Sequence, residues 1–111
     1  MASGTIPISK GVNNYRTVNS LDDLDNYYGA GKEGFYYLNS SVYNKNPQTQ
    51  VETGIKNTPL GWCCMLVFSL PSGVSYQMLF SHQLYIRSRT GSAPDGSLQW
   101  NPWQKATLTQ V

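Results

Sequence analysis

Few side chains in this sequence could act as an acid, a base or a nucleophile. Cys63 and Cys64 are adjacent, and His82 is the single histidine among 111 residues. A thiol beside an imidazole can form a nucleophile and base pair, but both cysteines stand in an apolar run, where burial disfavours the thiolate. A disulfide between neighbours would need a strained turn. The pattern therefore predicts two free thiols, at least one of them packed as a small buried hydrophobe.

Carboxylates cluster at Asp22, Asp23 and Asp25. Such a group could serve a glycosidase or a calcium loop, but the Asp-x-Asp-x-Asp-Gly spacing of a calcium loop is absent. The three acids suit the first turn of a helix, where negative charge is favourable. Because Glu33 and Glu52 stand in predicted loops, the sequence offers no catalytic pair, no metal site and no cofactor site. We therefore do not expect an enzyme.

A strand pattern near the C-terminus carries the first candidates for ligand binding. Two aliphatic residues alternate there with Tyr85, Arg87 and Arg89, so these three share one face of a strand. Exposed arginines beside a tyrosine could bind a carboxylate or phosphate of a glycan in a bidentate manner. The alternative is that they are solvated or form a structural ion pair with Asp95 or Glu52.

The second group of candidates is a tryptophan pair, Trp100 and Trp103, separated by Asn101 and Pro102. A tryptophan ring can stack on the C–H face of a sugar, and the nearby Asn101, Gln99 and Gln104 could hydrogen-bond the sugar hydroxyls. Residues three apart in an extended segment face opposite ways, so we expect one tryptophan in the core and the other at a surface or subunit interface. The candidate ligand-binding residues are Tyr85, Arg87, Arg89, Asn101 and Trp103.

The composition limits the classes of partner. The length of 111 residues suits one domain, and only 13% of the residues are charged while 40% are hydrophobic. The net charge of +2 is too small to hold a polyanion by counterion release, so nucleic acid is not an expected partner. The longest apolar run, residues 62–68, is far shorter than a membrane span. This profile is typical of an exposed β protein that binds through hydrogen bonds and aromatic faces.

Patterning predicts an all-β chain, an antiparallel sheet or sandwich, with one short N-terminal helix. Residues 20–28 predict that helix, with Ser20 at the N-cap and Leu21, Leu24 and Tyr28 on one side. Residues 34–38 predict a strand, and residues 62–70 predict a central strand with Trp62 in the core. A turn is expected at residues 71–73.

The strand predicted at residues 74–80 alternates clearly. Large apolar residues, Tyr76 and Met78 among them, are expected to face the core, while Ser75 and Gln77 face solvent or a partner. In the next strand the same reasoning places Arg87 on an exposed face. Residues 1–18 predict a connector or edge segment, and residues 19–111 predict the folded domain.

Several of these segments, in their order and spacing, resemble the pyocin-knob family. The similarity covers residues 20–106, and its most specific element is a tyrosine, an apolar residue and an arginine followed by Trp-x-x-Trp. The segments that carry it are Leu21-Asp22-Asp23-Leu24, Gly34-Phe35-Tyr36, Gly61-Trp62, Gln77-Met78-Leu79-Phe80, Leu84-Tyr85-Ile86-Arg87 and Trp100-Asn101-Pro102-Trp103-Gln104-Lys105.

The resemblance implies a β-rich knob on a phage or pyocin tail fibre, commonly trimeric and exposed on the virion. Residues 1–18 would then be a connector or the junction with the fibre shaft. The expected function is attachment to the host cell surface by non-covalent recognition of a glycan or cell-wall polymer, as a homotrimer, without nucleic acid and without membrane insertion. The alternatives are a structural trimerisation cap with no ligand of its own and part of a polysaccharide-degrading fibre enzyme.

Overall fold

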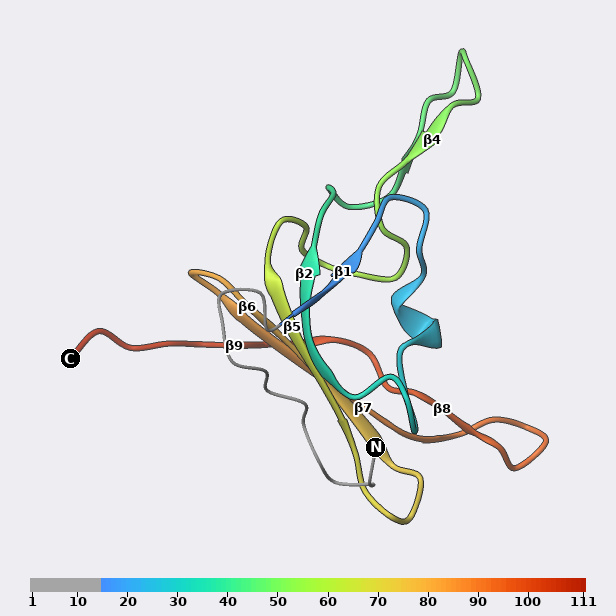
Figure 1. The fold of residues 1–111 in the computed structure, drawn as a ribbon, viewed down its shortest axis with the longest axis vertical. Helices are drawn as coiled ribbons and strands as arrows, with labels where there is room; N and C mark the ends of the chain where they lie inside the picture. Colours follow the sequence, from blue (N-terminus) through green and yellow to red (C-terminus); the bar gives the residue numbers. More distant parts are fainter. Residues whose placement is uncertain (1–14) are drawn as a thin grey trace.

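The computed structural model describes residues 15–111 (Figure 1). Within these residues, regular structure consists of nine strands and a single 3-10 turn. These are β1 (Arg16–Val18), η1 (Leu24–Asn26), β2 (Gly34–Leu38), β3 (Asn44–Lys45), β4 (Glu52–Thr53), β5 (Cys64–Ser69), β6 (Ser75–Phe80), β7 (Leu84–Ser92), β8 (Leu98–Trp100) and β9 (Gln104–Ala106).

Seven strands form one main sheet in the order β1-β2-β5-β6-β7-β8, and β9 pairs with β7 beyond the end of β8. The β1–β2 pair is parallel and every other pair is antiparallel. Strands β3 and β4 form a separate ribbon that projects from the sheet (Figure 1). The prediction of a β-dominated chain is confirmed, and so are the strand at residues 34–38 and the central position of β5.

The last residues of the predicted connector, 16–18, form strand β1 of the main sheet. β1 pairs with β2, and the Val18 side chain is fully buried. The rest of the predicted connector, residues 1–14, lies outside the described residues.

The predicted helix at residues 20–28 is replaced by the single turn η1. Its N-cap is Asp23, which accepts a hydrogen bond from the Asp25 backbone N–H at 2.8 Å. Ser20 instead accepts one from the N–H of Gly54 at 2.8 Å. The reason is competition for backbone groups: the N–H of Leu24 donates to the carbonyl of Lys56 at 3.1 Å, so this stretch is bonded to a distant segment and cannot close helical turns.

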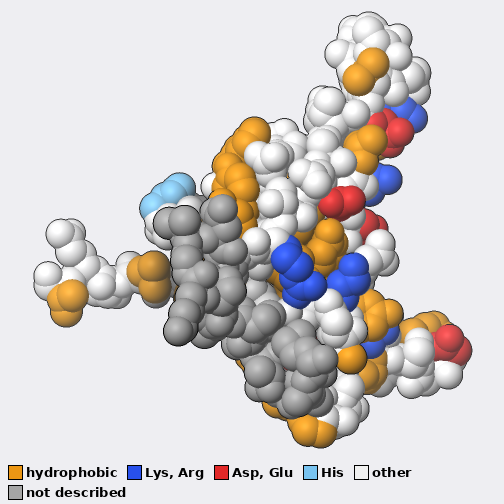
Figure 2. Space-filling model, viewed as in Figure 1, with side chains coloured by type: hydrophobic (Ala, Val, Ile, Leu, Met, Phe, Trp, Pro, Cys, Tyr) orange, Lys and Arg blue, Asp and Glu red, His pale blue; other side chains and the backbone are white. Residues whose placement is uncertain are grey.

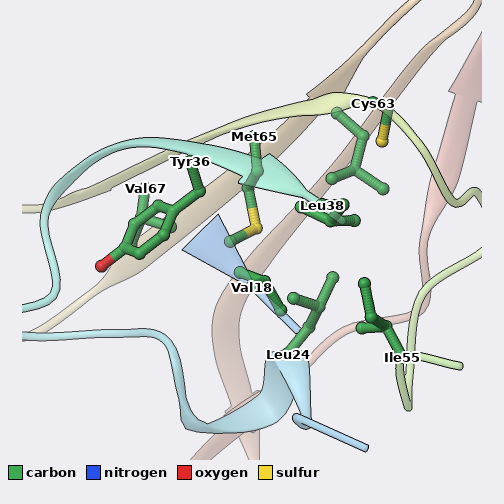
Figure 3. Close-up of a cluster of buried hydrophobic side chains, with 9 residues drawn as sticks. Val18, Leu24, Tyr36, Leu38, Ile55, Cys63, Met65 and Val67 are labelled. Atoms are coloured by element: carbon green, nitrogen blue, oxygen red, sulfur yellow. The ribbon is translucent and has the colours of Figure 1, made fainter. Parts of the chain in front are cut away.

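Buried side chains gather on one face of the main sheet (Figure 3). Leu24 from η1 and Ile55 from the segment after β4 pack against side chains of β2, β5 and β6. Burial of each aliphatic side chain contributes about 1.5–3 kcal/mol. The cluster comprises Val18, Leu24, Tyr36, Leu38, Ile55, Cys63, Met65, Val67 and Leu79.

The side of β6 that is buried is opposite to the predicted one. Ser75 and Gln77 are completely buried, whereas Tyr76 and Met78 are half-buried and Phe80 is exposed. The segment between β1 and β2, residues 19–33, lies over this side of the sheet and is called the covering segment. It supplies the polar partners of Gln77, whose amide donates to the carbonyls of Leu24 at 2.7 Å and Tyr27 at 2.9 Å. A buried amide that finds hydrogen-bond partners avoids the desolvation penalty.

The main sheet therefore has two faces, which are called the covered face and the open face. The covered face carries Tyr36, Met65, Val67, Ser75, Gln77, Leu79, Tyr85, Arg87 and Arg89. The open face carries Phe35, Tyr37, Cys64, Leu66, Phe68, Tyr76, Met78, Phe80, Leu84, Ile86 and Ser88.

Trp62 lies outside the core, contrary to the prediction. Its side chain is 60% exposed and its backbone has a φ of 50°. The N–H of Trp62 donates to the carbonyl of Ser40 at 3.0 Å, so the chain turns here before β5 begins at Cys64. After the turn, Cys63 is buried and Cys64 is exposed, which confirms that one thiol packs in the core.

Candidate functional site

Arg87, predicted to be exposed, is only 6% exposed and sits on the covered face. Its Nε–H donates to Oε1 of Gln77 at 2.8 Å, and Nη1 donates to Oδ1 of Asp25 at 2.9 Å. Asp25 comes from η1, so β6, β7 and the covering segment meet at this guanidinium. Arg87 therefore forms a structural ion pair, but its partner is Asp25 and not Asp95 or Glu52, the two carboxylates considered from the sequence.

Both tryptophans of the Trp-x-x-Trp segment flank the same guanidinium. The Arg87 guanidinium carbon lies 4.2 Å from the ring centroid of Trp100 and 4.5 Å from that of Trp103. Each indole N–H also has a partner, the carbonyl of Asp25 at 3.1 Å for Trp100 and that of Asn57 at 3.0 Å for Trp103. The prediction that these rings face opposite ways is therefore wrong.

The reason is an irregularity in the pairing with β7. Arg89 pairs with Trp100 and Ile86 pairs with Gln104, so residues 101–103 lie opposite only two residues of β7, at 87 and 88. An extra residue of this kind shifts the alternation of side chains. It brings both rings to the covered face.

The charge of the Arg87 guanidinium is compensated within the chain by Asp25. Burial lowers the pKa of Arg87, and the hydrogen bond and charge of Asp25 oppose that shift, so the guanidinium stays cationic. Stacking a desolvated cation on an aromatic face contributes about 2 kcal/mol. Arg87 therefore joins the covering segment to the sheet. Its Nη2 has no hydrogen-bond partner within residues 15–111.

Two other predicted site residues also make internal contacts. Tyr85 is half-buried against the core, and its hydroxyl donates to Oε1 of Gln83 at 3.3 Å. The guanidinium carbon of Arg89 lies 3.8 Å from the ring centroid of Tyr28. Tyr85, Arg87, Arg89 and Trp103 thus all make their contacts on the covered face of the main sheet.

Asn101 belongs to a shallow depression of about 420 Å³ at the edge of the open face. The depression forms where residues 101–104 leave β8 and rejoin β7 as β9. Its apolar wall comes from Tyr76, Ile86 and Pro102, and its polar atoms come from Ser88, Asn101 and Gln104. The full set of lining residues is Tyr76, Ile86, Arg87, Ser88, Asn101, Pro102 and Gln104.

Hydrogen bonds within the chain fix the polar side chains that line the depression. The Asn101 amide donates to the hydroxyls of Ser88 at 3.0 Å and Thr90 at 2.5 Å, and the Asn101 backbone N–H donates to the Ser88 carbonyl at 2.8 Å. The ring of Tyr76 stacks on Phe68 with centroids 4.9 Å apart. Such preorganisation reduces the entropy lost on binding.

The chemistry of this depression is that of a neutral ligand. None of its lining residues is a carboxylate, and the one charged side chain, Arg87, directs its guanidinium to Asp25. A wall with an aromatic ring beside hydroxyl and amide groups suits a sugar, which has an apolar C–H face and several hydroxyls.

Sequence reasoning found Asn101 but missed Tyr76, Ile86, Ser88 and Pro102 as lining residues. Alternation along β7 correctly places Ile86 and Arg87 on opposite faces of the sheet. It cannot say which side is covered, because the cover comes from residues far away in the sequence. Gln104, which the sequence offers beside Asn101 as a hydrogen-bonding residue for a sugar, also lines the depression.

The remaining side chains that could act as a nucleophile or a base, Cys63 and His82, do not form a common site. Burial raises the pKa of the Cys63 thiol to about 11, which keeps it protonated at neutral pH. His82 lies near the C-terminal segment, in a separate depression of about 360 Å³ with Lys105. Within residues 15–111 no three His, Cys, Asp or Glu side chains are placed to hold a metal ion. The same residues contain no helix with the length and apolarity needed to cross a bilayer.

Comparison with protein-family models, with curated proteins and with solved structures finds no match to this chain. The resemblance to the pyocin-knob family therefore stays a hypothesis that depends on the sequence segments alone.

Proposed function

We propose that this chain is a binding domain of a phage fibre that attaches to a neutral glycan of the host surface through the depression beside Asn101. The observation that carries the proposal is the combination of an apolar wall with fixed, uncharged polar groups. The fibre tip as its place on the virion follows from the resemblance, and so does display as a homotrimer.

In this mechanism the sugar lies against Tyr76 and Ile86, while its hydroxyls bond to Ser88, Asn101 and Gln104. A depression this open leaves much of the ligand in water, so a single site binds weakly. Presentation of several sites on one fibre multiplies the affinity without a new contact. Because no charge takes part, binding should change little with salt concentration.

The test is glycan binding by the purified chain, measured on a glycan array and on intact host-type cells. Gln104→Ala removes an exposed polar group of the depression and should weaken single-site binding about 3- to 10-fold, the value of one hydrogen bond. Gln48→Ala is the matched control, because Gln48 is equally exposed but lies in the β3–β4 ribbon.

Equal binding by wild type, Gln104→Ala and Tyr76→Ala would contradict the assignment of the depression. Loss of binding in Arg89→Ala or Trp103→Ala, with the fold intact, would show instead that residues predicted from the sequence form the binding site. Absence of any glycan or cell binding would contradict the proposed function itself.

A structural trimerisation cap with no ligand of its own is the second candidate. The observation that favours it is the open face of the main sheet, where apolar side chains remain exposed. A cap predicts that Gln104→Ala changes nothing, while substitutions on the open face alter assembly. A fibre enzyme is not favoured, because no carboxylate lines the depression.

A further inference from the structure

The side-chain amide of Asn101 is held in one orientation by its neighbours in β7. Its Nδ2 group donates to the hydroxyls of Ser88 at 3.0 Å and Thr90 at 2.5 Å. An amide carries only two N–H donors, so both are used within the chain. No residue within 15–111 donates to Oδ1 of Asn101. Because Nη2 of Arg87 is the one buried side-chain atom of these residues without a partner, Oδ1 is accessible to solvent. Asn101 can therefore accept a hydrogen bond from a ligand but has no N–H left to donate.

Gly91 provides the space that Oδ1 occupies. A Cβ atom at this position would lie 2.9 Å from Oδ1 of Asn101, 3.1 Å from Cγ of Gln99 and 3.3 Å from the Gln99 carbonyl oxygen. The pairing of β7 with β8 shifts register between Arg89 and Gly91, and a glycine at such an irregularity allows another group to approach the backbone closely. A side chain at residue 91 would push Oδ1 out of its place.

The fixed acceptor at this site is uncharged. Figure 2 shows acidic atoms at the outer tip of the turn that joins β7 to β8. The acid of that turn, Asp95, accepts hydrogen bonds from the backbone N–H and the hydroxyl of Ser97 at 3.0 and 2.6 Å. No carboxylate lines the depression, so the fixed acceptor offered there is the amide carbonyl of Asn101. A neutral carbonyl suits a neutral donor such as a sugar hydroxyl.

We propose that Gly91 is a positioning residue of the depression, and that the site selects a sugar hydroxyl that donates to Oδ1 of Asn101. This inference rests on the proposed function, because it names the hydrogen-bond polarity that the bound glycan must have. A sugar whose hydroxyl is methylated or replaced by fluorine at this position cannot donate, and it would leave Oδ1 without a partner. A site built to bond a hydroxyl rejects an analogue that lacks it.

Gly91→Ala tests the positioning role. The φ of Gly91 lies outside the left-handed region, so alanine fits the backbone. The most crowded atom is the end of a side chain, which can swing away, so the fold should be kept while Asn101 leaves its hydrogen bonds. Binding of a neutral sugar should weaken about 3- to 10-fold. Ser92→Ala changes the exposed next residue of β7, and as the matched control it should bind as the wild type does.

A double-mutant cycle separates this role from a general effect on the fold. Asn101→Ala alone should weaken binding about 3- to 10-fold. Adding Gly91→Ala to Asn101→Ala should weaken binding by less than about twofold more, because the residue through which Gly91 acts is gone. An equal loss from Gly91→Ala in both backgrounds would overturn the positioning role.

The ligand side is tested with methyl glycosides of glucose, galactose, mannose and N-acetylglucosamine, titrated into the 15N-labelled chain and followed by NMR. Monodeoxy and monofluoro analogues of each glycoside that binds are then compared. At one ring position both replacements should weaken binding about 3- to 10-fold, because neither analogue can donate. If the fluoro analogue binds as well as its parent while the deoxy analogue does not, Asn101 donates to the ligand and the proposal is wrong. No loss at any position also overturns it.

The orientation of the amide can be followed without a ligand. The Nδ2 protons of Asn101 should exchange with water about 3- to 10-fold more slowly than those of the exposed Gln48 amide, and Gly91→Ala should remove this protection. Fast exchange in a wild type that still binds a glycoside overturns this inference and leaves the proposed function standing. Protection that is lost in Gly91→Ala, with no glycoside bound by the wild type, supports the positioning role and contradicts the proposed function.

Discussion

At the scale of single residues, Arg87 shows how one side chain can join two layers. It contacts Gln77 in β6, Asp25 in η1 and the rings of Trp100 and Trp103. Every one of these partners except Asp25 lies in the main sheet or the segment that rejoins it. The guanidinium therefore stabilises the attachment of the covering segment, a structural role that leaves ligand binding to the other face.

Arg87→Ala should lower the free energy of unfolding by about 3 kcal/mol, because it leaves Gln77 and Asp25 without their common partner. Asp25 is 43% exposed, so Asp25→Asn, which keeps hydrogen-bonding atoms and removes only the charge, should cost about 1 kcal/mol or less. Urea denaturation followed by tryptophan fluorescence measures both changes.

Equal stability of Arg87→Ala and the wild type would contradict this role. Loss of glycan binding in that variant at unchanged stability would instead favour the sequence-based hypothesis that Arg87 contacts the ligand.

At the scale of elements, strand β6 shows that alternation does not decide which side of a strand is buried. Both sides carry residues that could pack: Tyr76 and Met78 on one, Leu79 and Gln77 on the other. Burial of Gln77 follows from three hydrogen bonds, two donated to the covering segment and one accepted from Arg87. The polar residue is thus fixed by partners from other elements.

Gln77→Leu provides the test at this scale. It should destabilise the chain by about 2–4 kcal/mol, because the carbonyls of Leu24 and Tyr27 and the Nε–H of Arg87 lose their buried partner. On an exposed face the same change would be nearly neutral. Gln83→Leu, at a half-buried position between β6 and β7, is the control and should change stability by less than about 1 kcal/mol. Thermal denaturation by circular dichroism measures both.

At the scale of the whole molecule, the covering segment makes stability depend on pH. The rings of Tyr27 and Tyr36 meet edge to face with centroids 5.1 Å apart between this segment and the sheet. Burial, followed by the charge of Asp22, raises the pKa of Tyr27 to about 12, and burial also raises that of Tyr36. Ionisation of either phenol therefore opposes packing of the two layers.

The free energy of unfolding should fall between about pH 10 and about pH 12. The pKa of Tyr27 is higher in the folded chain than its usual value of 10.0, so its contribution is complete below pH 10 and is lost as the pH rises through 12. Urea denaturation across this range gives the slope. Tyr27→Phe should make the slope shallower without removing it, because Tyr36 titrates in the same direction, and an unchanged slope in that variant would contradict the assignment.

The sequence by itself determined the β class, the strand at residues 34–38, the central strand and the turn at residues 71–73. These depend on local alternation and on turn residues, which act over a few positions. The tertiary structure decided which face of β6 and β7 is covered, because the cover comes from residues around Leu24 and Ile55. It also converted the predicted helix into one turn by bonding its backbone to residues 54–56.

The same division holds for the candidate site. Asn101 is a polar residue in an aromatic segment, and the sequence alone marked it as a binding candidate. Its neighbours Tyr76 and Ser88 come from other strands, and sheet register brings them to one edge. The Arg87 side chain is buried because a bulge opposite β7 brings both tryptophan rings to it and because it pairs with Asp25, 62 residues away along the chain. Local pattern therefore defined the strands, and long-range hydrogen bonding and burial defined the site.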